Sequence, residues 1–598
     1  MTTPIHILSE SFGHEDFRPG QEEIVNHILA GRNVLAVMPT GAGKSICYQV
    51  PSQLLERPTI VISPLVALMD NQAAGLRANG VSVASIHSGQ SREENVAQWK
   101  MMAQGSAKLL YLSPERLMQP RMLSAMEALN PSLFVVDEAH CVSKWGPAFR
   151  PEYADLSRLK DMFPKARIAA FTATADESTR KDIAAQLFAG QGKIIVHGFD
   201  RPNLSLTVST LTNRTQQLLA WMETQRGQSG IVYCLSRKNT EKYAQILKNE
   251  GFNALPYHAG LSSETRFENQ ERFLAEPAVV IVATIAFGMG IDKSNVRFVY
   301  HLNLPSSLEA YYQEIGRAGR DGAPSETGLI YALDDIRMRR QFIVDDGSDS
   351  EHQIREHRRL DALLGYCEAA KCRRQVLMAY FGELSDPCGN CDVCENPPDL
   401  IDATEAAKAL FGAIEQTGQR FGATHVIAVA RGDETERILQ YNHDKLPVFG
   451  SADKPKSWFQ GLLRQAVALR YLNVNMEAYG RLEIRPKARA VLEEGEPFNC
   501  KDPTVKRTGK KLVNRVSVQT QQTALGGEET ELLSRLKILR MDFAKQLGKP
   551  AFVVFSDATL IDMVSRMPTT REEMLEVSGV GPSKLERFGE AFLAKIDG

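Results

Sequence analysis

The stretch "VLAVMPTGAGKSICYQV" (residues 34–50) decides the fold of the first part of the chain. A short apolar run ends in a glycine-containing turn, and a lysine and a serine follow where a helix is expected to begin. Gly41 and Gly43 permit tight backbone turns, while Lys44 can reach terminal phosphates and Ser45 can bind Mg²⁺. The stretch therefore predicts a phosphate-binding loop between a buried strand and a helix. An ordinary flexible loop is the alternative, because one glycine of the strict pattern is replaced by methionine.

Similar apolar runs recur along the chain and predict two parallel sheets. Continuous apolar runs separated by helical stretches are typical of parallel strands that are buried on both faces. The pattern restarts at residue 229, which indicates two α/β domains with a cleft between them. The runs are residues 34–38, 59–63, 108–113, 133–137 and 167–175 in the first domain, and 229–234, 278–284 and 297–302 in the second.

An acidic pair, Asp137 and Glu138, stands at the end of one of these runs, about ninety residues after the glycine-containing turn. A carboxylate at Asp137 suits the coordination shell of Mg²⁺, and Glu138 can orient or deprotonate an attacking water. Such a pair alone also occurs in solvated turns, but its position at a strand end after the loop is poorly explained that way. The two features together predict an ATP site.

Two arginines near the end of the second α/β domain are candidates for contact with the same nucleotide. Arg317 and Arg320 lie three residues apart in "YYQEIGRAGRDG" (residues 311–322), on one face of a helix or turn. A guanidinium that reaches across a domain cleft to a γ-phosphate is an arginine finger. A salt-bridged surface helix is the alternative interpretation.

Four cysteines crowd one region and predict a metal site. Fifteen residues separate the first cysteine from the second, and gaps of two residues follow. Thiolates at this spacing can surround a tetrahedral Zn²⁺ in a closed, structural site, whereas the alternative is a set of free thiols. These residues are Cys372, Cys388, Cys391 and Cys394. The other five cysteines are predicted to be buried thiols: Cys47, Cys141, Cys234, Cys367 and Cys500.

Length and composition bound the architecture and say little about partners. With 598 residues and roughly 150 residues per domain, about four domains are expected. No apolar run reaches the roughly 18 residues that a membrane span needs, so we expect a cytoplasmic protein without membrane contact. The net charge of −2 neither supports nor excludes nucleic acid, because local basic patches can bind phosphates.

Seven motifs occur along the chain in a fixed order. They are "FRPGQ" (17–21), "TGAGKS" (40–45), "SPLVALMDNQ" (63–72), "DEAH" (137–140), "FTATA" (171–175), "ATIAFGMGIDK" (283–293) and "QEIGRAGRDG" (313–322). This is the order found in superfamily 2 helicases, and the wording of the motifs resembles the RecQ family of DNA helicases. The resemblance implies an α/β fold with two RecA-like parallel-sheet motor domains, a helical zinc-binding module, a winged helix and a small all-helical HRDC domain. The implied domains are residues 1–205 (ATP-binding), 206–345 (helicase C-terminal), 346–400 (zinc), 401–500 (winged helix), 501–525 (basic linker) and 526–598 (HRDC).

The resemblance also implies roles for single residues around ATP. Gln21 would read the adenine edge, which suits the paired donor and acceptor of a glutamine amide. The family often carries Tyr at the position of His14. The implied nucleotide-binding set is Arg18, Gln21, Thr40, Gly41, Gly43, Lys44, Ser45 and Asp137, with Glu138, Arg317 and Arg320 completing the catalytic set and Ser45 and Asp137 holding Mg²⁺.

The run after the acidic pair resembles an aromatic-rich loop that contacts single-stranded DNA and reports its presence to the ATP site. Trp145 and Phe149 would stack on bases, worth roughly 1–3 kcal/mol per base, and Arg150 would contact phosphate or nucleotide. A core or turn cluster is the alternative for each aromatic. The family usually has His-Asp where this chain has Pro147 and Ala148, so we expect altered coupling between DNA binding and hydrolysis.

Three further residues in the C-terminal modules are candidate DNA contacts. Tyr479, at the expected hairpin tip of the winged helix, can wedge against a base pair or equally pack on its own sheet. Phe552 can stack on a base, and Lys584 lies near Gly579 and Gly581, whose backbone N–H groups can hold a phosphate. HRDC domains vary in what they bind, so protein partners stay open for this module.

The resemblance implies a 3′-to-5′ ATP-dependent DNA helicase that acts in recombination, replication-fork repair and the DNA damage response. It implies ATP, Mg²⁺ and one structural Zn²⁺ as cofactors, and single-stranded and duplex or branched DNA as partners. Single-stranded-DNA-binding protein and recombination proteins are the implied protein partners, in a cytoplasmic, nucleoid-associated setting. The competing interpretations are an RNA-directed ATPase and a DNA-binding scaffold whose motor is impaired at Pro147 and Ala148.

Overall fold

A computed structural model of the 598-residue chain describes residues 3–39, 41–64, 66–143, 151–175, 177–287, 293–347, 349–475, 481–502, 527–547 and 551–597. The first domain is a seven-stranded parallel sheet in the order β3-β4-β2-β5-β6-β1-β7. Its strands are β1 Val34–Val37, β2 Thr59–Ile62, β3 Val83–Ile86, β4 Leu109–Leu112, β5 Leu133–Val136, β6 Arg167–Thr172 and β7 Lys193–Val196. Its helices are α1 Pro4–Phe12, α2 Gln21–Leu29, α3 Ile46–Leu54, α4 Val66–Ala78, α5 Arg92–Ala103, α6 Pro114–Leu117, α7 Pro120–Leu129, α8 Pro151–Ala154, α9 Leu159–Met162 and α10 Glu177–Phe188.

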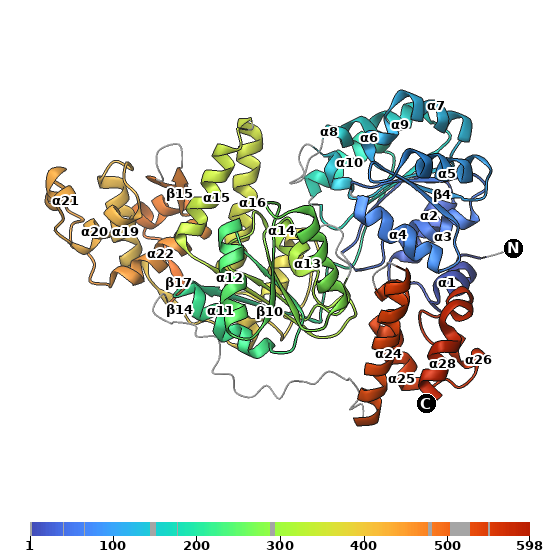
Figure 1. Ribbon diagram of the computed structural model, residues 1–598. Helices are drawn as coiled ribbons and strands as arrows, with labels where there is room; N and C mark the ends of the chain where they lie inside the picture. The colour runs from blue at the N-terminus through green and yellow to red at the C-terminus, as the bar shows by residue number, and fades with distance from the viewer. Residues whose placement is uncertain are drawn as a thin grey trace.

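Burial on both faces explains why the strands are continuously apolar. In β1, Leu35 and Val37 belong to one core cluster, while Val34 and Ala36 belong to another on the opposite face. Helices cover both faces of the sheet (Figure 1). Alternating side chains of a strand point to opposite faces, so a strand between two helical layers has no polar side.

The second domain is a six-stranded parallel sheet in the order β10-β11-β9-β12-β13-β8. Its strands are β8 Leu204–Thr210, β9 Gly230–Tyr233, β10 Asn253–Tyr257, β11 Val279–Ala283, β12 Phe298–His301 and β13 Ser325–Tyr331. Its helices are α11 Arg214–Met222, α12 Arg237–Asn249, α13 Ser263–Ala275, α14 Leu308–Ile315 and α15 Leu333–Asp345. The prediction of two parallel-sheet domains is confirmed.

Helical modules follow the second sheet, and most of the helices lie away from the first domain (Figure 1). The zinc module contains α16 Ser350–Glu368, α17 Arg373–Phe381 and α18 Asp392–Glu395. The winged-helix module contains α19 Thr404–Gln416, α20 Ala423–Arg431, α21 Glu436–Gln440, α22 Lys456–Ala468 and α23 Pro486–Arg489. Its antiparallel strands are β15 Leu472–Asn475 and β16 Arg481–Ile484, while β14 Leu400–Asp402 pairs with β17 Asn499–Lys501.

A buried carboxylate joins three of these modules. Glu368, the last residue of α16, contacts the Tyr331 hydroxyl of the second sheet, the Arg464 guanidinium of α22 and Lys501 Nζ of β17, the last at 2.8 Å. Burial by itself raises the pKa of a carboxyl, but the Arg464 and Lys501 cations lower the Glu368 pKa to about 2. The winged helix is thus tied to the second sheet through a satisfied, charged contact.

The C-terminal helical domain has a core of its own and lies against the first domain. It contains α24 Gly527–Leu547, α25 Asp557–Arg566, α26 Arg571–Leu575, α27 Pro582–Lys584 and α28 Glu590–Asp597 around a separate apolar cluster. It lies beside α1 and α4, at the opposite end of the molecule from α21 (Figure 1). The Gly579 amide donates to the Gly13 carbonyl at 2.8 Å, which fixes this contact through the backbone.

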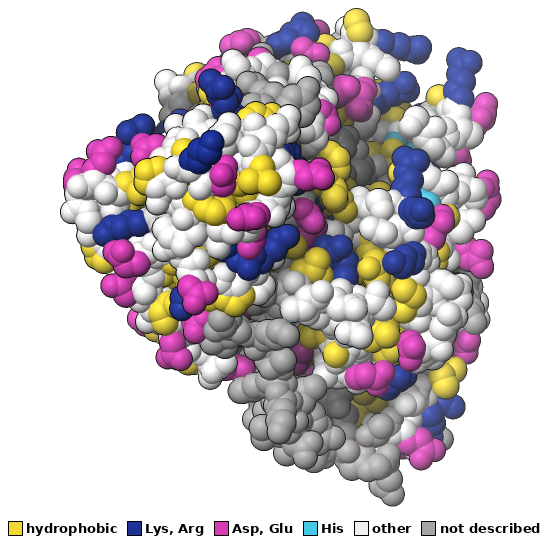
Figure 2. All heavy atoms as spheres, turned by 90° about the vertical axis from the view of Figure 1, so that its left-hand side faces the viewer, with side chains coloured by type: hydrophobic (Ala, Val, Ile, Leu, Met, Phe, Trp, Pro, Cys, Tyr) yellow, Lys and Arg dark blue, Asp and Glu magenta, His cyan; other side chains and the backbone are white. Residues whose placement is uncertain are grey.

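Surface charge is mixed, in keeping with the small net charge. Viewed from the winged-helix end, Lys and Arg side chains alternate with Asp and Glu side chains over the visible face (Figure 2). Among the described residues, no helix combines the length and apolar character that crossing a membrane requires.

A histidine pair in the winged helix predicts a pH-dependent stability. His425 Nε2 and His443 Nδ1 lie 2.7 Å apart, and His425 stacks on Phe421 with ring centroids 4.1 Å apart. Burial, together with the charges of His443 and Arg437, lowers the pKa of His425 to about 4. A histidine in an unfolded chain titrates near 6.5, so between these values only the unfolded state binds the proton.

We therefore expect the contribution of His425 to the stability of the winged helix to be full above about pH 6.5 and to be lost as the pH falls towards 4. Scanning calorimetry at pH 7.5 and pH 5 measures this as a fall in melting temperature. His425→Phe retains an aromatic ring without an ionisable group, so its fall between the two pH values should be smaller. Equal falls in wild type and variant would contradict the assignment.

Candidate active site

The phosphate-binding loop predicted from the sequence adopts a conformation that requires its glycines. Gly41 and Gly43 have φ values of 86° and 78°, in the left-handed region that favours glycine. Ser45 is the N-cap of α3. Lys44 Nζ donates to the carbonyls of Met38 and Pro39 at 3.2 and 3.4 Å, so the loop curls around the lysine head. Burial lowers the pKa of Lys44, although the nearby Glu138 and Asp137 oppose that shift.

Two residues of the "FRPGQ" motif brace this loop. Arg18 Nη1 donates to the Gly41 carbonyl at 2.9 Å, and Gln21 Nε2 donates to the carbonyls of Ala42 and Gly43 at 3.0 and 3.1 Å. Gln21 Oε1 accepts from the Arg18 amide at 2.9 Å. Both ends of the Gln21 amide therefore face protein groups, and adenine readout by Gln21 stays a prediction.

The acidic pair follows β5 directly and lies beside the loop. Asp137 Oδ1 accepts from the Glu138 amide at 3.0 Å, and Glu138 has a left-handed φ of 50°. Burial, and then the neighbouring Glu138, raise the pKa of Asp137 to about 7, while Lys44 opposes the shift. A divalent cation bound at Asp137 would favour its charged form, which is the chemistry expected of a Mg²⁺ ligand.

A chain of polar contacts leads from the acidic pair to the second domain. His140 Nδ1 lies 3.4 Å from Glu138 Oε2 and 2.9 Å from Thr172 Oγ1. Thr172 Oγ1 donates to the Thr174 carbonyl at 3.1 Å, and Thr174 Oγ1 accepts from Gln313 Nε2 of α14 at 2.7 Å. The carboxylate predicted to orient water is thus connected across the cleft to the segment that carries the arginines.

The two arginines predicted from the sequence occupy different places. Both follow the end of α14 at Ile315 and lie in the turn before β13. A Cβ built on Gly41 would lie 3.2 Å from Arg320 Cγ, which places Arg320 against the phosphate-binding loop. Arg317 instead lies within hydrogen-bonding range of Tyr233, inside the second domain. Only Arg320 of this pair is seen to reach the loop across the cleft.

A cavity of about 820 Å³ opens beside the loop and is shared with the C-terminal helical domain. His14, Arg18, Ser45 and Gln49 line one side, and Lys584 lines the other. Burial lowers the pKa of Lys584 to about 8 and is the main cause of the lowered pKa of His14. The predicted DNA contact Lys584 therefore faces the nucleotide side of the first domain.

One of the two backbone amides predicted to hold a phosphate near Lys584 is already bonded within the protein. The Gly579 amide is already bonded to the Gly13 carbonyl, and a Cβ on Gly581 would lie 3.0 Å from the Glu10 carbonyl oxygen. In this arrangement the glycines form the contact with the first domain, so the Gly579 amide is taken and is not offered to a phosphate.

Gly581→Val is expected to release the C-terminal helical domain from the first domain. Because that domain forms one side of the cavity beside the phosphate-binding loop, its release should also speed the loss of bound ADP. The Gly581 backbone is extended, with φ −90° and ψ 167°, so valine suits its conformation but its methyl groups would meet the first domain. Stopped-flow dissociation of a fluorescent ADP analogue measures the rate. Glu572→Val, on the exposed surface of α26, is the control and should dissociate at the wild-type rate. A wild-type rate for Gly581→Val would contradict the expectation.

The four cysteines predicted to bind zinc lie together. Their Sγ atoms all lie within 4.8 Å of one another, with Cys372 and Cys388 Sγ 3.5 Å apart and Cys391 and Cys372 Sγ 4.0 Å apart. A tetrahedral site with Zn–S bonds of about 2.3 Å requires S···S separations of about 3.8 Å, so these residues fit Zn²⁺. Cys394 completes the set. The five remaining cysteines are buried thiols, as predicted.

Several predicted DNA contacts lie outside the described residues. These are Trp145, Phe149, Arg150 and Tyr479, together with Thr40 of the loop, Pro147 and Ala148, and the side chain of Phe552. Tyr153, four residues after Phe149, is fully buried, and its hydroxyl donates to the Asp137 carbonyl at 3.1 Å. Tyr153 therefore belongs to the core of the first domain.

Two residues that no sequence motif marks, Arg201 and Asn203, bond to the turn that carries Arg317 and Arg320. The signal that points to them is the polar run "DRPN" (200–203), which interrupts the connection between two otherwise apolar sheets.

Five family models match consecutive parts of the chain. They are DEAD/DEAH box helicase at residues 18–183, helicase conserved C-terminal domain at 211–322, RecQ zinc-binding at 333–395, RQC domain at 397–508 and HRDC domain at 529–596. Together they confirm the predicted kinds and order of modules, while the exact domain boundaries stay predictions.

Curated relatives match over nearly the full length. The chain is 40% identical to the ATP-dependent DNA helicase RecQ of Haemophilus influenzae, with 99% of this chain and 96% of the relative covered. It is 40% identical to the Pasteurella multocida protein of that name, covering 99% and 93%, and 35% identical to that of Bacillus subtilis, covering 99% and 98%. With its two parallel sheets, phosphate-binding loop and four-cysteine cluster, the chain belongs to the RecQ family of helicases.

Proposed function

We propose that this chain is an ATP-dependent DNA helicase that moves 3′ to 5′ along single-stranded DNA and unwinds duplex or branched DNA. The observation that carries the proposal is Arg320, which extends from the second domain to the phosphate-binding loop of the first. A nucleotide site completed by residues of both domains couples ATP binding to closure of the cleft. The full-length match to DNA helicases supports DNA as the polymer that this motion moves.

Within the proposed site the loop binds the phosphates and the acidic pair carries the chemistry. Lys44 contacts the terminal phosphates, Ser45 and Asp137 would hold Mg²⁺, and Glu138 orients the attacking water. When bound, Mg²⁺ neutralises charge that builds up on the phosphate oxygens. Arg320 adds a guanidinium to the γ-phosphate, and Arg317 supports it from the second domain. Arg18, Gln21, Thr40, Gly41 and Gly43 complete the nucleotide-binding set.

DNA contacts are proposed along the same cleft and on the accessory modules. The proposed contacts are Trp145, Phe149 and Arg150 beside the ATP site, Tyr479 on the winged helix, and Phe552 and Lys584 on the HRDC domain. Contacts with the phosphate backbone should make affinity fall steeply with salt and depend little on sequence. Single-stranded-DNA-binding protein and recombination proteins are the proposed partners, in a cytoplasmic, nucleoid-associated role in recombination, replication-fork repair and the DNA damage response.

The test measures ATP hydrolysis without nucleic acid, with single-stranded DNA and with single-stranded RNA, and then unwinding of duplexes with a 3′ or a 5′ tail. Strong stimulation by DNA and unwinding of the 3′-tailed duplex are expected. Greater stimulation by RNA would indicate an RNA-directed ATPase instead.

The Pro147→His/Ala148→Asp double variant tests whether these two residues alter the coupling between DNA binding and hydrolysis. Equal stimulation of ATP hydrolysis by DNA in the wild type and in the variant would contradict altered coupling.

A further inference from the structure

The connection between the two motor domains runs from the end of β7 at Val196 to the start of β8 at Leu204. We call residues 199–203 the linker and residues 316–324, between α14 and β13, the finger segment. The linker is bound to the second domain and the zinc module. The Phe199 carbonyl accepts from the Tyr312 hydroxyl at 2.8 Å, and the Phe199 ring stacks on Phe381 with centroids 4.3 Å apart.

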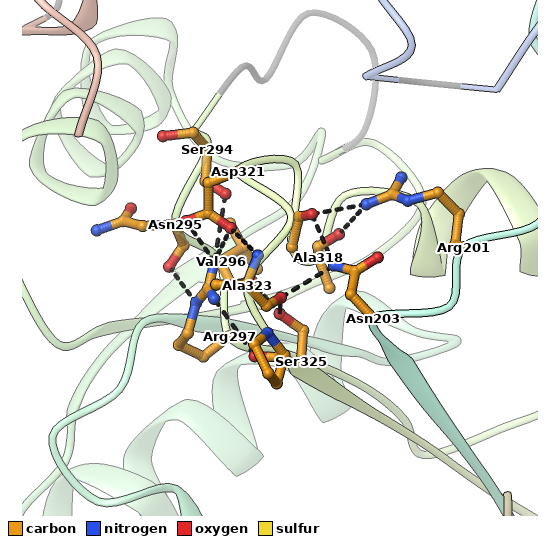
Figure 3. Close-up of polar contacts among 12 residues, drawn as sticks. Arg201, Asn203, Ser294, Asn295, Val296, Arg297, Ala318, Asp321, Ala323 and Ser325 are labelled. Carbon is orange, nitrogen blue, oxygen red and sulfur yellow. Dashed lines mark hydrogen bonds and ion pairs between the residues drawn. The ribbon is translucent and has the colours of Figure 1, made fainter. Parts of the chain in front are cut away.

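Arg201 extends from the linker and bonds to the backbone of the finger segment. Its Nη2 donates to the carbonyls of Ala318 and Gly319 at 2.9 and 2.8 Å, and its Nη1 donates to the Gly316 carbonyl at 3.4 Å. These carbonyls lie on both sides of Arg317 and directly before Arg320. Figure 3 shows Arg201 approaching this turn from the linker, with Ala318 between it and the rest of the segment.

Asn203 holds the other half of the same turn. Its Nδ2 donates to the carbonyls of Gly319 and Ala323, both at 2.9 Å (Figure 3). Gly319 has φ 58°, and a Cβ there would lie 2.3 Å from Asn203 Nδ2, so the backbone must approach the amide closely. Arg297 supports the far end through an ion pair with Asp321 at 2.7 Å.

Side chains of Arg201, Asn203 and Arg297 therefore hold the finger segment along most of its length. It is an irregular stretch in which Gly316, Ala318 and Gly319 are buried. A planar guanidinium that donates to their three carbonyls fixes the relative positions of these groups. An arginine finger must place its guanidinium within hydrogen-bonding distance, about 2.8 Å, of the γ-phosphate oxygens. A misplacement of about 1 Å can cost about 10²-fold in rate. Arg201, which lies in the linker between the two motor domains, therefore holds the backbone that carries Arg320.

We propose that Arg201 is a positioning residue for ATP hydrolysis, because it sets the finger segment, and with it Arg320, in the orientation that meets the nucleotide when the cleft closes. This inference rests on the proposed ATPase function. Arg201 contacts the backbone of the segment and acts through Arg320. Asn203 supports the same turn from the adjacent position.

The experiment uses the full-length protein with Arg201→Ala and Arg201→Lys, and Arg339→Lys as the matched control. Arg339 is also largely enclosed and donates from Nε to a backbone carbonyl of the second domain, that of Leu304 at 2.7 Å, but it does not bond to the finger segment. The readouts are kcat and KM for DNA-stimulated ATP hydrolysis, the melting temperature, and the affinities for ADP and for ADP with aluminium fluoride, which mimics the transferring phosphate.

Arg201→Ala is expected to lower kcat by about 10- to 10²-fold with KM for ATP within about twofold, and to lose the preference for ADP–aluminium fluoride over ADP. For Arg201→Lys, kcat and the preference for ADP–aluminium fluoride should lie between those of the wild type and Arg201→Ala, because one ammonium cannot bridge three carbonyls. The Arg339→Lys control should keep both the wild-type kcat and the preference.

Retention of the preference by Arg201→Lys and Arg201→Ala would overturn the proposal, as would a loss of kcat that merely follows the melting temperature. If Arg201→Ala does not fold, the affinities of Arg201→Lys for ADP–aluminium fluoride and for ADP decide: a preference equal to that of the wild type would overturn the proposal. Failure of the proposed function is distinguishable, because the wild-type protein itself would then show no DNA-stimulated hydrolysis.

Discussion

Glu138→Gln is expected to lower the rate of ATP hydrolysis by about 10²- to 10⁴-fold, while ATP affinity stays within about twofold. Glutamine has the shape of glutamate and can still accept a hydrogen bond from water, but it cannot take up a proton. The side chain follows β5 in a left-handed turn and lies 3.4 Å from His140, so its position is fixed before substrate binds. Hydrolysis at saturating DNA, with ATP binding measured separately, checks the result.

The control for this change is Glu127→Gln, an exposed glutamate of α7 in the same domain, which should hydrolyse ATP at the wild-type rate. Lys44→Ala complements it, because loss of the lysine should weaken binding of the phosphates as well as hydrolysis. A Glu138→Gln protein that retains a tenth or more of the wild-type rate would assign the water to another base.

Loss of zinc is expected to unfold the module that carries it and to separate the winged helix from the second motor domain. Structural zinc sites contribute about 10–16 kcal/mol of apparent binding free energy, which is folding free energy for a module of this size. Cys391→Ser should therefore lower the melting temperature sharply, and a chelator should produce the same species from wild type. Zinc released on unfolding, measured with a chromophoric chelator, should approach one ion per chain in wild type.

The contacts around Cys391 explain why the damage should spread. Cys391 pairs with Leu206 of β8 through an isolated bridge, and the next residue, Asp392, accepts from Arg373 Nε at 2.9 Å. Arg373 Nη1 in turn donates to the Cys367 carbonyl at 2.9 Å, one residue before Glu368. Cys500→Ser, at a buried cysteine outside the cluster, is the control and should cost far less. Equal losses in the two variants would exclude a structural metal.

The sheets, the phosphate-binding loop and the zinc cluster could be predicted from the sequence because each is specified locally. Gly41, Gly43, Lys44 and Ser45 are consecutive or nearly so, and three of the four cysteine ligands lie within seven residues. Local spacing restricts such groups to few geometries, and the structure brings them together as expected.

The contacts that the sequence did not reveal join residues far apart in the chain. Arg201 meets Gly319 across 118 positions, and the Gly579 amide meets the carbonyl of Gly13 near the opposite terminus. In both contacts the accepting group is a backbone carbonyl, and because every residue has one, the sequence does not mark which carbonyl is used. The separate positions of Arg317 and Arg320 depend likewise on the turn after α14, which spacing alone left as helix or turn.

The junction at Glu368 has a consequence for how such modules can be exchanged between proteins. Its charge lies almost wholly out of solvent and is balanced by Arg464 and Lys501, which belong to the winged helix. A winged helix transplanted from a protein without these two cations would leave the carboxylate uncompensated, at a cost of about 3–5 kcal/mol. We therefore expect the second motor domain, the zinc module and the winged helix to be transferable between proteins only as one unit, whereas the C-terminal helical domain has a core of its own and should be separable.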